Sequence, residues 1–569
     1  MNKAVLLLAV LLAVATALAA VLAPLKPGQS LNVVGTATIN ALAVSSSGGG
    51  AVVPIEITLL SPGNGRVYVA GVPEAGEGFG PSAQVALYVA ARLAGSPAAN
   101  YTALVRVESL EASVGGPSAS GYITAAMFAL MKGLPIRNDT AMTGIILPDG
   151  TIGWVGGVGD KVAAAAQNGI KYVLVPLGEQ GQASGVSGVK VIPIATVQQA
   201  IYYLTGYNVT LPYGPSSLNA TVFNETSRYL YQQVLSIYKN ATGASAGAYV
   251  NMSALSSLAS EGQYYTAASL LYSGLYNYYS AQISNGALSA GALYRQALSL
   301  AKSYEEAVRE VPITSNNLGV IIGIYERIYQ IYQEANSSSP DAALMYTRAV
   351  TLPPWINAAR ALAYGRVINE SSLQDMTETY LEYAYVMYSY VISTYGNQLP
   401  SDLVNELQQS FQLAQDLYSS GHYLASLAAS LDTISLSENA LAAPGADSLA
   451  PVERQTALEN IYRAAACGSP NILPLSYIQF GDYYLGKDNV EALYMYEEAS
   501  MYAAAIGDIL CSGNATYVIT KAPANMSALA PPPVVSPATT PSGTTVNYII
   551  SIVLIIFVVS VVIISIKKR

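Results

Sequence analysis

The chain has 569 residues, enough for three or four domains at about 150 residues each. Apolar residues make up 52% of the sequence and charged residues 11%, against roughly 25% in ordinary soluble domains, which argues against disorder and favours a part in or beside a membrane. The net charge of −9 leaves no cationic footprint for nucleic acid. The single histidine, His422, lies in a Tyr- and Leu-rich stretch and is expected to pack there, so we predict no metal site and no cofactor.

The two ends of the chain predict a membrane anchor. Residues 1–24 join Lys3 to an apolar run with small residues near its end, as in a signal peptide or an N-terminal anchor. Residues 547–566 are apolar and about 30 Å long as a helix, which predicts a transmembrane helix, followed by a basic cytoplasmic tail at 567–569. We therefore expect a single-pass protein of the cell membrane, with the bulk of the chain extracytoplasmic.

Two further patterns fit such a location. Cys467 and Cys511 are the only cysteines, and in an oxidising compartment they would form a disulfide, although two buried free thiols are the alternative. The density of Asn-x-Ser/Thr sequons suggests a glycoprotein. The sequon asparagines are Asn100, Asn138, Asn208, Asn219, Asn224, Asn240, Asn251, Asn336, Asn369, Asn514 and Asn525.

Between the ends, the residue pattern divides the chain into three parts. Residues 31–205 alternate strand-like runs with Ala-rich helical stretches and Gly turns, which predicts an α/β or α+β domain. Residues 206–520 place apolar residues at three- and four-residue spacing and predict an all-α, repeat-like region without a strict period. Residues 521–546 are rich in Pro, Ser and Thr and predict a stalk. The clearest strand-like runs are 52–59, 67–72, 104–108 and 172–175, and the clearest helical ones are 264–279, 318–335, 376–395 and 490–505.

The first candidate for catalysis is a serine at a tight turn. The segment GGPSASG precedes a helical pattern at 122–134, so Ser118 is expected where a turn enters a helix, with its hydroxyl exposed. The first N–H groups of a helix have no intrahelical acceptor, and the helix dipole is positive at this end. The turn that Ser118 shares with Gly116, Pro117 and Ala119 would therefore suit an oxyanion.

The second candidate is a lysine that follows 43 residues later. Lys161 comes after a glycine-rich turn, and apolar neighbours such as Val158 and Val162 would lower its pKa by disfavouring the charged form. A neutral Lys161 would take the proton from Ser118. Asp160 either orients the lysine or begins its helix, and the residues leave both open. Ser120 is either a second hydroxyl in the site or, as we favour, a helix cap.

Three segments resemble the Ser/Lys proteolytic domain of Lon proteases. GPSAS around Ser118 resembles that family's nucleophile turn, PIRNDTAMTG (135–144) its middle segment, and GGVGDKVAAAAQNGIKYVLVP (156–176) its lysine segment, in the family's order. The Ser-Ala-Ser is similar to that of archaeal members. The resemblance covers residues near 32–203, under a third of the chain.

The resemblance implies an α+β proteolytic fold and a serine-type endopeptidase acting on polypeptides. Ser118 would be the nucleophile that forms an acyl-enzyme, Lys161 the general base, and Thr143 a hydrogen-bonding support for the lysine. Two positions depart from the family: Gly115 replaces an acidic residue before the nucleophile, and Ile145 replaces the Glu that commonly follows Met-Thr-Gly.

The ATPase of Lon proteases has no counterpart motif in this sequence. GxxxxGK[ST] does not occur, and the nearest approach, GDYYLGKD at 481–488, ends in Asp. We therefore expect an ATP-independent protease similar to exported, membrane-anchored archaeal Lon-like proteases; whether it forms a ring-like homo-oligomer stays open. The alternatives are a catalytically inactive binding or scaffold protein of the cell envelope on a Lon-like fold, and a self-processing protein.

Overall fold

A seven-stranded mixed sheet forms the N-terminal part of the chain in the computed structural model, which describes residues 31–44, 48–70, 78–107, 116–511 and 517–521. The strand order is β3-β4-β2-β1-β5-β8-β9. The antiparallel pairs are β1 with β2 and β2 with β4, and all other neighbours are parallel. The strands are β1 (Asn32–Val44), β2 (Gly50–Ser61), β3 (Val67–Ala70), β4 (Thr102–Val107), β5 (Thr140–Met142), β8 (Tyr172–Pro176) and β9 (Lys190–Ile194).

The burial of these strands follows from their sequences. In β2, Val53, Ile55, Ile57 and Leu59 are buried and alternate with partly exposed residues, as expected of a strand with one face on the core. The interior strand β5, between β1 and β8, is buried at every residue. The described residues of the four strand-like runs all fall in strands, which confirms the α+β prediction for this part.

Four helices complete this domain. They are α2 (Phe79–Leu93), α3 (Ser120–Lys132), α4 (Val158–Gln167) and α5 (Val197–Thr205). Helix α3 packs on β1 and β2 and is flanked by α2 and α5, while α4 packs on β1 and β2. A small hairpin of β6 (Ile145–Ile146) and β7 (Ile152–Gly153) lies between β5 and α4. This hairpin therefore connects the two segments that carry Thr143 and Lys161.

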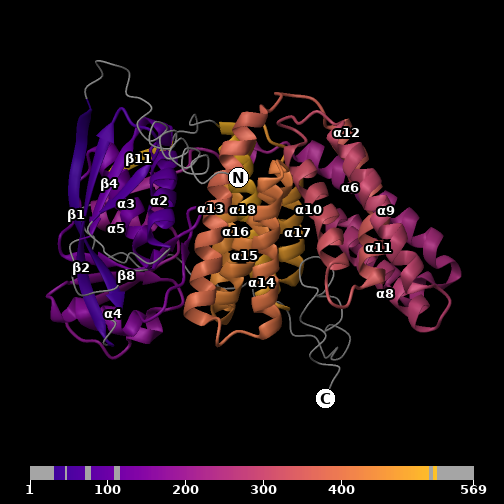
Figure 1. The fold of residues 1–569 in the computed structure, drawn as a ribbon, viewed down its shortest axis with the longest axis horizontal. Helices are drawn as coiled ribbons and strands as arrows, with labels where there is room; N and C mark the ends of the chain where they lie inside the picture. The colour runs from indigo at the N-terminus through magenta and orange to yellow at the C-terminus, as the bar shows by residue number, and fades with distance from the viewer. Residues whose placement is uncertain (1–30, 45–47, 71–77, 108–115, 512–516, 522–569) are drawn as a thin grey trace, which may run out of the picture.

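Thirteen helices follow within the described residues and form the mostly helical remainder of the chain. Figure 1 shows α13, α15, α16 and α18 standing between the sheet domain and the outer helices α6, α8, α9, α11 and α12. The thirteen helices are α6 (Ala220–Thr242), α7 (Met252–Ser260), α8 (Tyr264–Ser284), α9 (Ala290–Arg309), α10 (Leu318–Ala335), α11 (Ala342–Val350), α12 (Leu352–Ala361), α13 (Glu370–Tyr395), α14 (Ser401–Ser419), α15 (Tyr423–Ala442), α16 (Ala446–Ala466), α17 (Ile472–Tyr484) and α18 (Asn489–Cys511).

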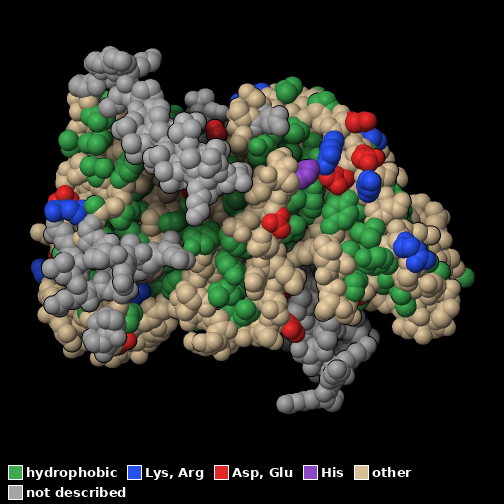
Figure 2. All heavy atoms as spheres, viewed as in Figure 1, with side chains coloured by type: hydrophobic (Ala, Val, Ile, Leu, Met, Phe, Trp, Pro, Cys, Tyr) green, Lys and Arg blue, Asp and Glu red, His purple; other side chains and the backbone are tan. Residues whose placement is uncertain are grey.

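Apolar spacing accounts for these helices. In α9, Leu293, Ala297 and Ala301 form one buried stripe, as expected of a helix at the surface. Helix α18 is instead buried all round, because α15, α16 and α17 enclose it. The four helical runs expected from the sequence fall in α8, α10, α13 and α18, which confirms them. Charged side chains are sparse on the face in Figure 2, in keeping with a composition of 11% charged residues.

The region predicted as all-α also contains a two-stranded ribbon. Strand β10 (Tyr207–Thr210) pairs antiparallel with β11 (Val518–Lys521), so the two ends of the helical region lie side by side. Helix α5 of the sheet domain packs against β10. Neither strand was predicted, because four residues are too few to show a period.

The structure contradicts the predicted membrane anchor. Across the described residues, no helix is both long and apolar enough to cross a bilayer. The long apolar helix α18 packs inside protein and carries four carboxylates, Glu491, Glu497, Glu498 and Asp508, which a lipid-facing helix would not hold. The fold is an α+β domain with a mostly helical region, and the predictions of a C-terminal transmembrane helix and of a single-pass membrane location were wrong. The stretches interpreted as signal, transmembrane helix and tail (1–24, 547–566 and 567–569) lie outside the described residues, as does the expected stalk apart from Lys521.

Several sequon asparagines have a local structural role. Asn219, Asn251 and Asn369 are the N-cap residues of α6, α7 and α13, and each side chain accepts a backbone N–H of the first turn. Asparagine before Ser or Thr is common at helix starts because both residue types satisfy free N–H groups. Helix capping thus gives part of the sequon density a physical origin independent of glycosylation.

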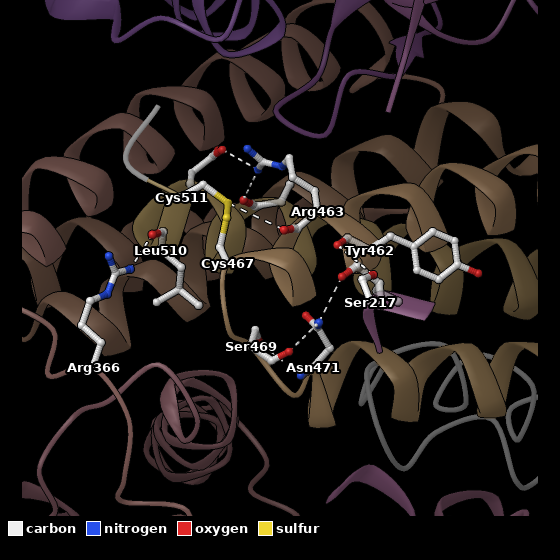
Figure 3. Close-up of a disulfide and its surroundings, with 12 residues drawn as sticks. Ser217, Arg366, Tyr462, Arg463, Cys467, Ser469, Asn471, Leu510 and Cys511 are labelled. Atoms are coloured by element: carbon white, nitrogen blue, oxygen red, sulfur yellow. Dashed lines mark hydrogen bonds and ion pairs between the residues drawn. A yellow bond between two sulfur atoms is a disulfide. The ribbon is translucent and has the colours of Figure 1, made fainter. Parts of the chain in front are cut away.

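A disulfide closes the end of the helical region. Cys467, the C-cap of α16, is bonded to Cys511, the last residue of α18, with their Cα atoms 5.3 Å apart (Figure 3). Beside it, the Arg366 guanidinium donates a hydrogen bond to the carbonyl of Leu510 (Figure 3). The disulfide therefore links the end of the central helix α18 to the end of its neighbour α16.

Replacing Cys467 and Cys511 together by alanine should lower the free energy of unfolding by about 4 kcal/mol. The reason is that the disulfide closes a segment of 44 residues in the unfolded chain, and the unfolded chain gains conformational entropy without it. Denaturant unfolding followed by circular dichroism measures this change. Reduction of the disulfide in the wild-type protein should also lower the free energy of unfolding. Equal stability of the double variant and the oxidised wild type would contradict the prediction.

Candidate functional site

Ser118 lies on a short 3₁₀ turn, Pro117–Ala119, that leads directly into α3. Gly116 precedes the turn in an extended conformation, and Pro117 begins it, where its missing N–H costs no hydrogen bond. Pro117 and Ala119 are buried while Ser118 is partly exposed. The sequence thus forms the predicted turn, with the serine at the positive end of the α3 dipole.

Backbone hydrogen bonds join this turn to the segment after β5. The N–H of Gly144 donates to the carbonyl of Ser118 at 2.8 Å, and the N–H of Gly121 donates to the carbonyl of Gly144 at 3.0 Å. Gly144 has a φ of +153°, and a Cβ there would lie 2.4 Å from Ile152 Cγ2, so only glycine fits. The turn that carries Ser118 and the Met-Thr-Gly segment are therefore held in fixed register.

Thr143 connects the serine and the lysine. Its side chain is fully buried, and its hydroxyl donates to the carbonyl of Ser118 at 3.5 Å. The same hydroxyl oxygen accepts a hydrogen bond from Lys161 Nζ at 3.2 Å. Since a hydroxyl has one donor and two acceptor sites, both bonds form at once. One threonine thus positions the lysine amine relative to the backbone of the serine.

Lys161 lies in the first turn of α4 and is almost completely buried, with 3% of its surface exposed. The helix begins after Gly157, whose φ of +69° is left-handed and whose Cβ would lie 2.6 Å from Val44 Cγ2. The buried residues around it in α4 include Val158 and Val162. Burial lowers the pKa of Lys161 to about 8, because a buried amine loses the hydration of its charged form.

A buried carboxylate that the sequence analysis did not single out acts on this lysine. Glu179 is 2% exposed and follows β8, and its charge partly offsets the lowering of the Lys161 pKa. Its Oε2 accepts the N–H of Val155 at 2.9 Å, and its Oε1 accepts Gln182 Nε2 at 3.1 Å. Burial raises the pKa of Glu179 to about 7, with Val155 and Lys161 opposing the rise. Glu179 thus faces both the loop before Lys161 and the amine itself.

The remaining candidates have structural surroundings that settle two open alternatives. Asp160 is exposed in the first turn of α4, near the positive end of the helix dipole, which favours a role at the helix start over one in orienting the buried Lys161. Ser120 is not a helix cap, because Ala119 occupies that position; its Oγ accepts the N–H of Ile146 and ties α3 to β6. Ile145 is fully buried in β6. Gly115 lies outside the described residues.

Two further predictions concern His422 and metal binding. His422 begins α15, and its ring contacts that of Tyr329 at 6.2 Å between centroids. Among the described residues, no group of histidine, cysteine and carboxylate side chains is arranged to hold a metal ion. The candidate site consists of Ser118, Lys161, Thr143 and Glu179.

Comparison with known proteins shows which family this part of the chain resembles. Residues 25–199 match the family model described as Lon protease (S16) C-terminal proteolytic domain. This part of the chain is similar to a Lon-type proteolytic domain. It therefore carries the fold of a serine-type peptidase, as the motifs around Ser118 and Lys161 predicted.

Individual relatives agree with the family model. The chain is 39% identical to a Lon protease of Fervidobacterium nodosum over 132 residues, 22% of this chain and 16% of that protein. It is 37% identical to a Lon protease of Syntrophomonas wolfei over 155 residues, 26% of this chain and 18% of that protein. It is 28% identical to an archaeal Lon protease of Thermococcus kodakarensis over 170 residues, 29% of this chain and 26% of that protein. The chain thus spans only a small part of each relative's length.

The pH dependence of peptide cleavage should follow Lys161. Because a general base must be neutral, kcat/KM should rise as the pH passes through about 8 and then level off. Glu179→Gln removes a negative charge that favours the charged lysine, so the midpoint should move to lower pH. Peptide cleavage followed from acid to alkaline pH tests both statements. An unchanged midpoint in Glu179→Gln would show that this carboxylate does not act on the lysine.

Thr143 offers a test of the hydrogen bond to the lysine. Thr143→Val keeps the shape of the side chain but leaves Lys161 Nζ without its partner, which should lower kcat/KM by about tenfold. Thr143→Ser keeps the hydroxyl and should retain most activity. Steady-state kinetics of both variants give the comparison, and equal activity of the valine and serine variants would count against the hydrogen bond.

Proposed function

We propose that this protein is an endopeptidase that cleaves polypeptides through an acyl-enzyme on Ser118, with Lys161 as the general base and without ATP. The observation that carries the proposal is the buried Lys161 amine, which shares the Thr143 hydroxyl with the backbone of Ser118. A lysine with a pKa of about 8 exists partly as the free amine near neutral pH, so it has the lone pair that a base needs.

The chemistry follows from these groups. Lys161 takes the proton of the Ser118 hydroxyl as Oγ attacks the carbonyl carbon of the scissile peptide. The tetrahedral intermediate then collapses, and the departing amine takes that proton from the Lys161 ammonium, which leaves an ester on Ser118. Water hydrolyses the ester, with Lys161 again accepting a proton and returning it to Ser118 Oγ. The Thr143 hydroxyl holds the amine in place throughout.

The position of Ser118 suits the negative charge of the intermediate. The serine stands on the turn that enters α3, a helix of 13 residues, and the dipole of that helix is positive at this end. Negative charge that develops beside Ser118 is stabilised there more than the neutral peptide is. This preference for the transition state is the basis of oxyanion stabilisation.

Independence from ATP is the finer part of the proposal. The sequence lacks GxxxxGK[ST], and its nearest approach, residues 481–488, runs from inside α17 through the turn to α18 rather than from a strand into a helix. Gly481 packs against Tyr496, since a Cβ there would lie 2.5 Å from Tyr496 Cε1. This segment therefore packs against α18 and does not have the form of a phosphate-binding loop.

Cleavage of casein or of a peptide library by the full chain, without nucleotide, tests the proposed function. Ser118→Ala and Lys161→Ala should each lose cleavage by at least about 10²-fold, because both remove a step of proton transfer or attack. Lys161→Arg should also be inactive, since arginine stays charged. Ser184→Ala and Lys171→Ala, on exposed residues of the same domain, are the matched controls and should behave as wild type.

Labelling of Ser118 by a fluorophosphonate probe separates the alternatives. A wild-type chain that neither cleaves nor labels at any pH, while folded, would reject the peptidase and favour a binding or scaffold protein. Labelling at Ser118 together with cleavage of the chain itself only would point to self-processing.

A further inference from the structure

The hairpin between Thr143 and Lys161 is held by the helical region as well as by its own domain. At its turn, the Asp149 side chain is 4% exposed, and Asp149 Oδ2 accepts the hydroxyl of Ser500 in α18 at 2.6 Å. The carbonyl of Asp149 accepts Asn460 Nδ2 of α16 at 3.1 Å. Both partners are buried. The turn is therefore attached to the two helices that form the centre of the helical region.

The other end of the hairpin contacts the helical region at two more points. The indole of Trp154 lies against Gly445, where a Cβ would come within 2.5 Å of Trp154 Cζ2. The N–H of Gly156 donates a hydrogen bond of 2.8 Å to the hydroxyl of Tyr390, which belongs to α13. A Cβ at Gly156 would also lie 3.4 Å from Thr394 Cγ2. The end of α13 thus covers the backbone that leads into the lysine helix.

Tyr390 also lies beside the serine turn. A Cβ at Gly116 would lie 3.9 Å from Tyr390 Cε2, so the ring is near the residue that precedes Pro117 and Ser118. Tyr390 is 8% exposed and packs edge-on against Tyr395. One side chain of the helical region therefore hydrogen-bonds to the loop before Lys161 and lies near the turn that carries Ser118.

Helix α13 is fixed to the sheet domain along its length, which makes Tyr390 a rigid contact. The hydroxyl of Tyr383 donates to the carbonyl of Val85 in α2, and that of Tyr380 donates to Asp508 at 3.0 Å. Asp508 in turn pairs with Arg92 of α2 at 3.3 Å. These groups are buried, so the contact does not depend on exposed, solvent-screened charges.

We infer that the helical region forms part of the active site, with Tyr390 as a positioning residue that fixes the loop before Lys161. The inference rests on the proposed function of the Ser/Lys pair. Consecutive amides of that loop are held from two sides: Val155 N–H by Glu179 of the proteolytic domain and Gly156 N–H by Tyr390 of the helical region. The helical region thereby sets the position of the lysine amine, and its docking on the hairpin makes the pair competent.

The test is Tyr390→Phe in the full chain, with Tyr388→Phe as the matched control. Both variants lose one hydroxyl from α13, but the ring of Tyr388 stacks on Phe411 within the helical region, with centroids 5.0 Å apart. Tyr390→Phe leaves the N–H of Gly156 without its acceptor. It should lower kcat and the rate of Ser118 labelling by about tenfold, while KM for a short peptide changes by less than about twofold. Tyr388→Phe should match the wild type in all three.

A second measurement needs no activity. Amide hydrogen exchange of the segment that contains Gly156 should be faster in Tyr390→Phe than in wild type or Tyr388→Phe, because the N–H has lost its bond. Unchanged kcat, labelling and exchange in Tyr390→Phe would overturn the inference, and so would equal losses in both variants. An inactive, unlabelled wild type would instead reject the proposed function, and faster exchange in Tyr390→Phe alone would still support the docking contact.

Discussion

The burial of one amine is the constraint on which the rest of the site depends. Lys161 is 3% exposed, and a charged ammonium in such a place is costly unless groups around it compensate. The Thr143 hydroxyl accepts one of its N–H groups, and the charge of Glu179 partly restores the ionised form. The balance leaves the lysine with a pKa of about 8, between that of a free amine in water and that of a fully desolvated one. A lysine in this range serves as a base without a histidine.

The fold supplies this environment through short connections in the sheet domain. Thr143 follows the central strand β5, and its N–H donates to the carbonyl of Leu174 in β8, so the threonine is fixed by two neighbouring strands. Gly144 then pairs with the serine turn on one side. The hairpin β6–β7 spans the distance to α4 and Lys161. The hairpin and the residues that follow it contact α13, α16 and α18, so the helical region packs directly on the segment that leads to Lys161. A separate domain on a flexible linker would not make these contacts.

Local sequence patterns predicted the parts of the site that are local. The glycine turn before Ser118 and the glycine turn before Lys161 each carry their conformation in neighbouring residues, and the strand and helix periods of β2, α10 and α18 are equally local. Glu179 was missed because its role arises from burial after β8. A lone carboxylate three residues after the buried run VLVP is the signal that would have found it. Tyr390 is one of 43 tyrosines, and nothing near it in the sequence indicates Gly156. The membrane prediction rested on the apolar runs 1–24 and 547–566, which lie outside the described residues, and no helix of the described residues is long and apolar enough to cross a bilayer. Composition alone does not distinguish apolar helices packed in protein, such as α18, from helices packed in lipid.

The most direct measurement is the ionisation of Lys161 itself in the folded chain. Carbon-13 NMR of protein labelled at the lysine ε carbons follows each amine through its titration, and Lys161→Arg identifies the resonance. A midpoint near 8 is predicted, moving to lower pH in Glu179→Gln. A midpoint at the ordinary lysine value of 10.5 would contradict the buried-base mechanism, because almost no free amine would then exist near neutral pH.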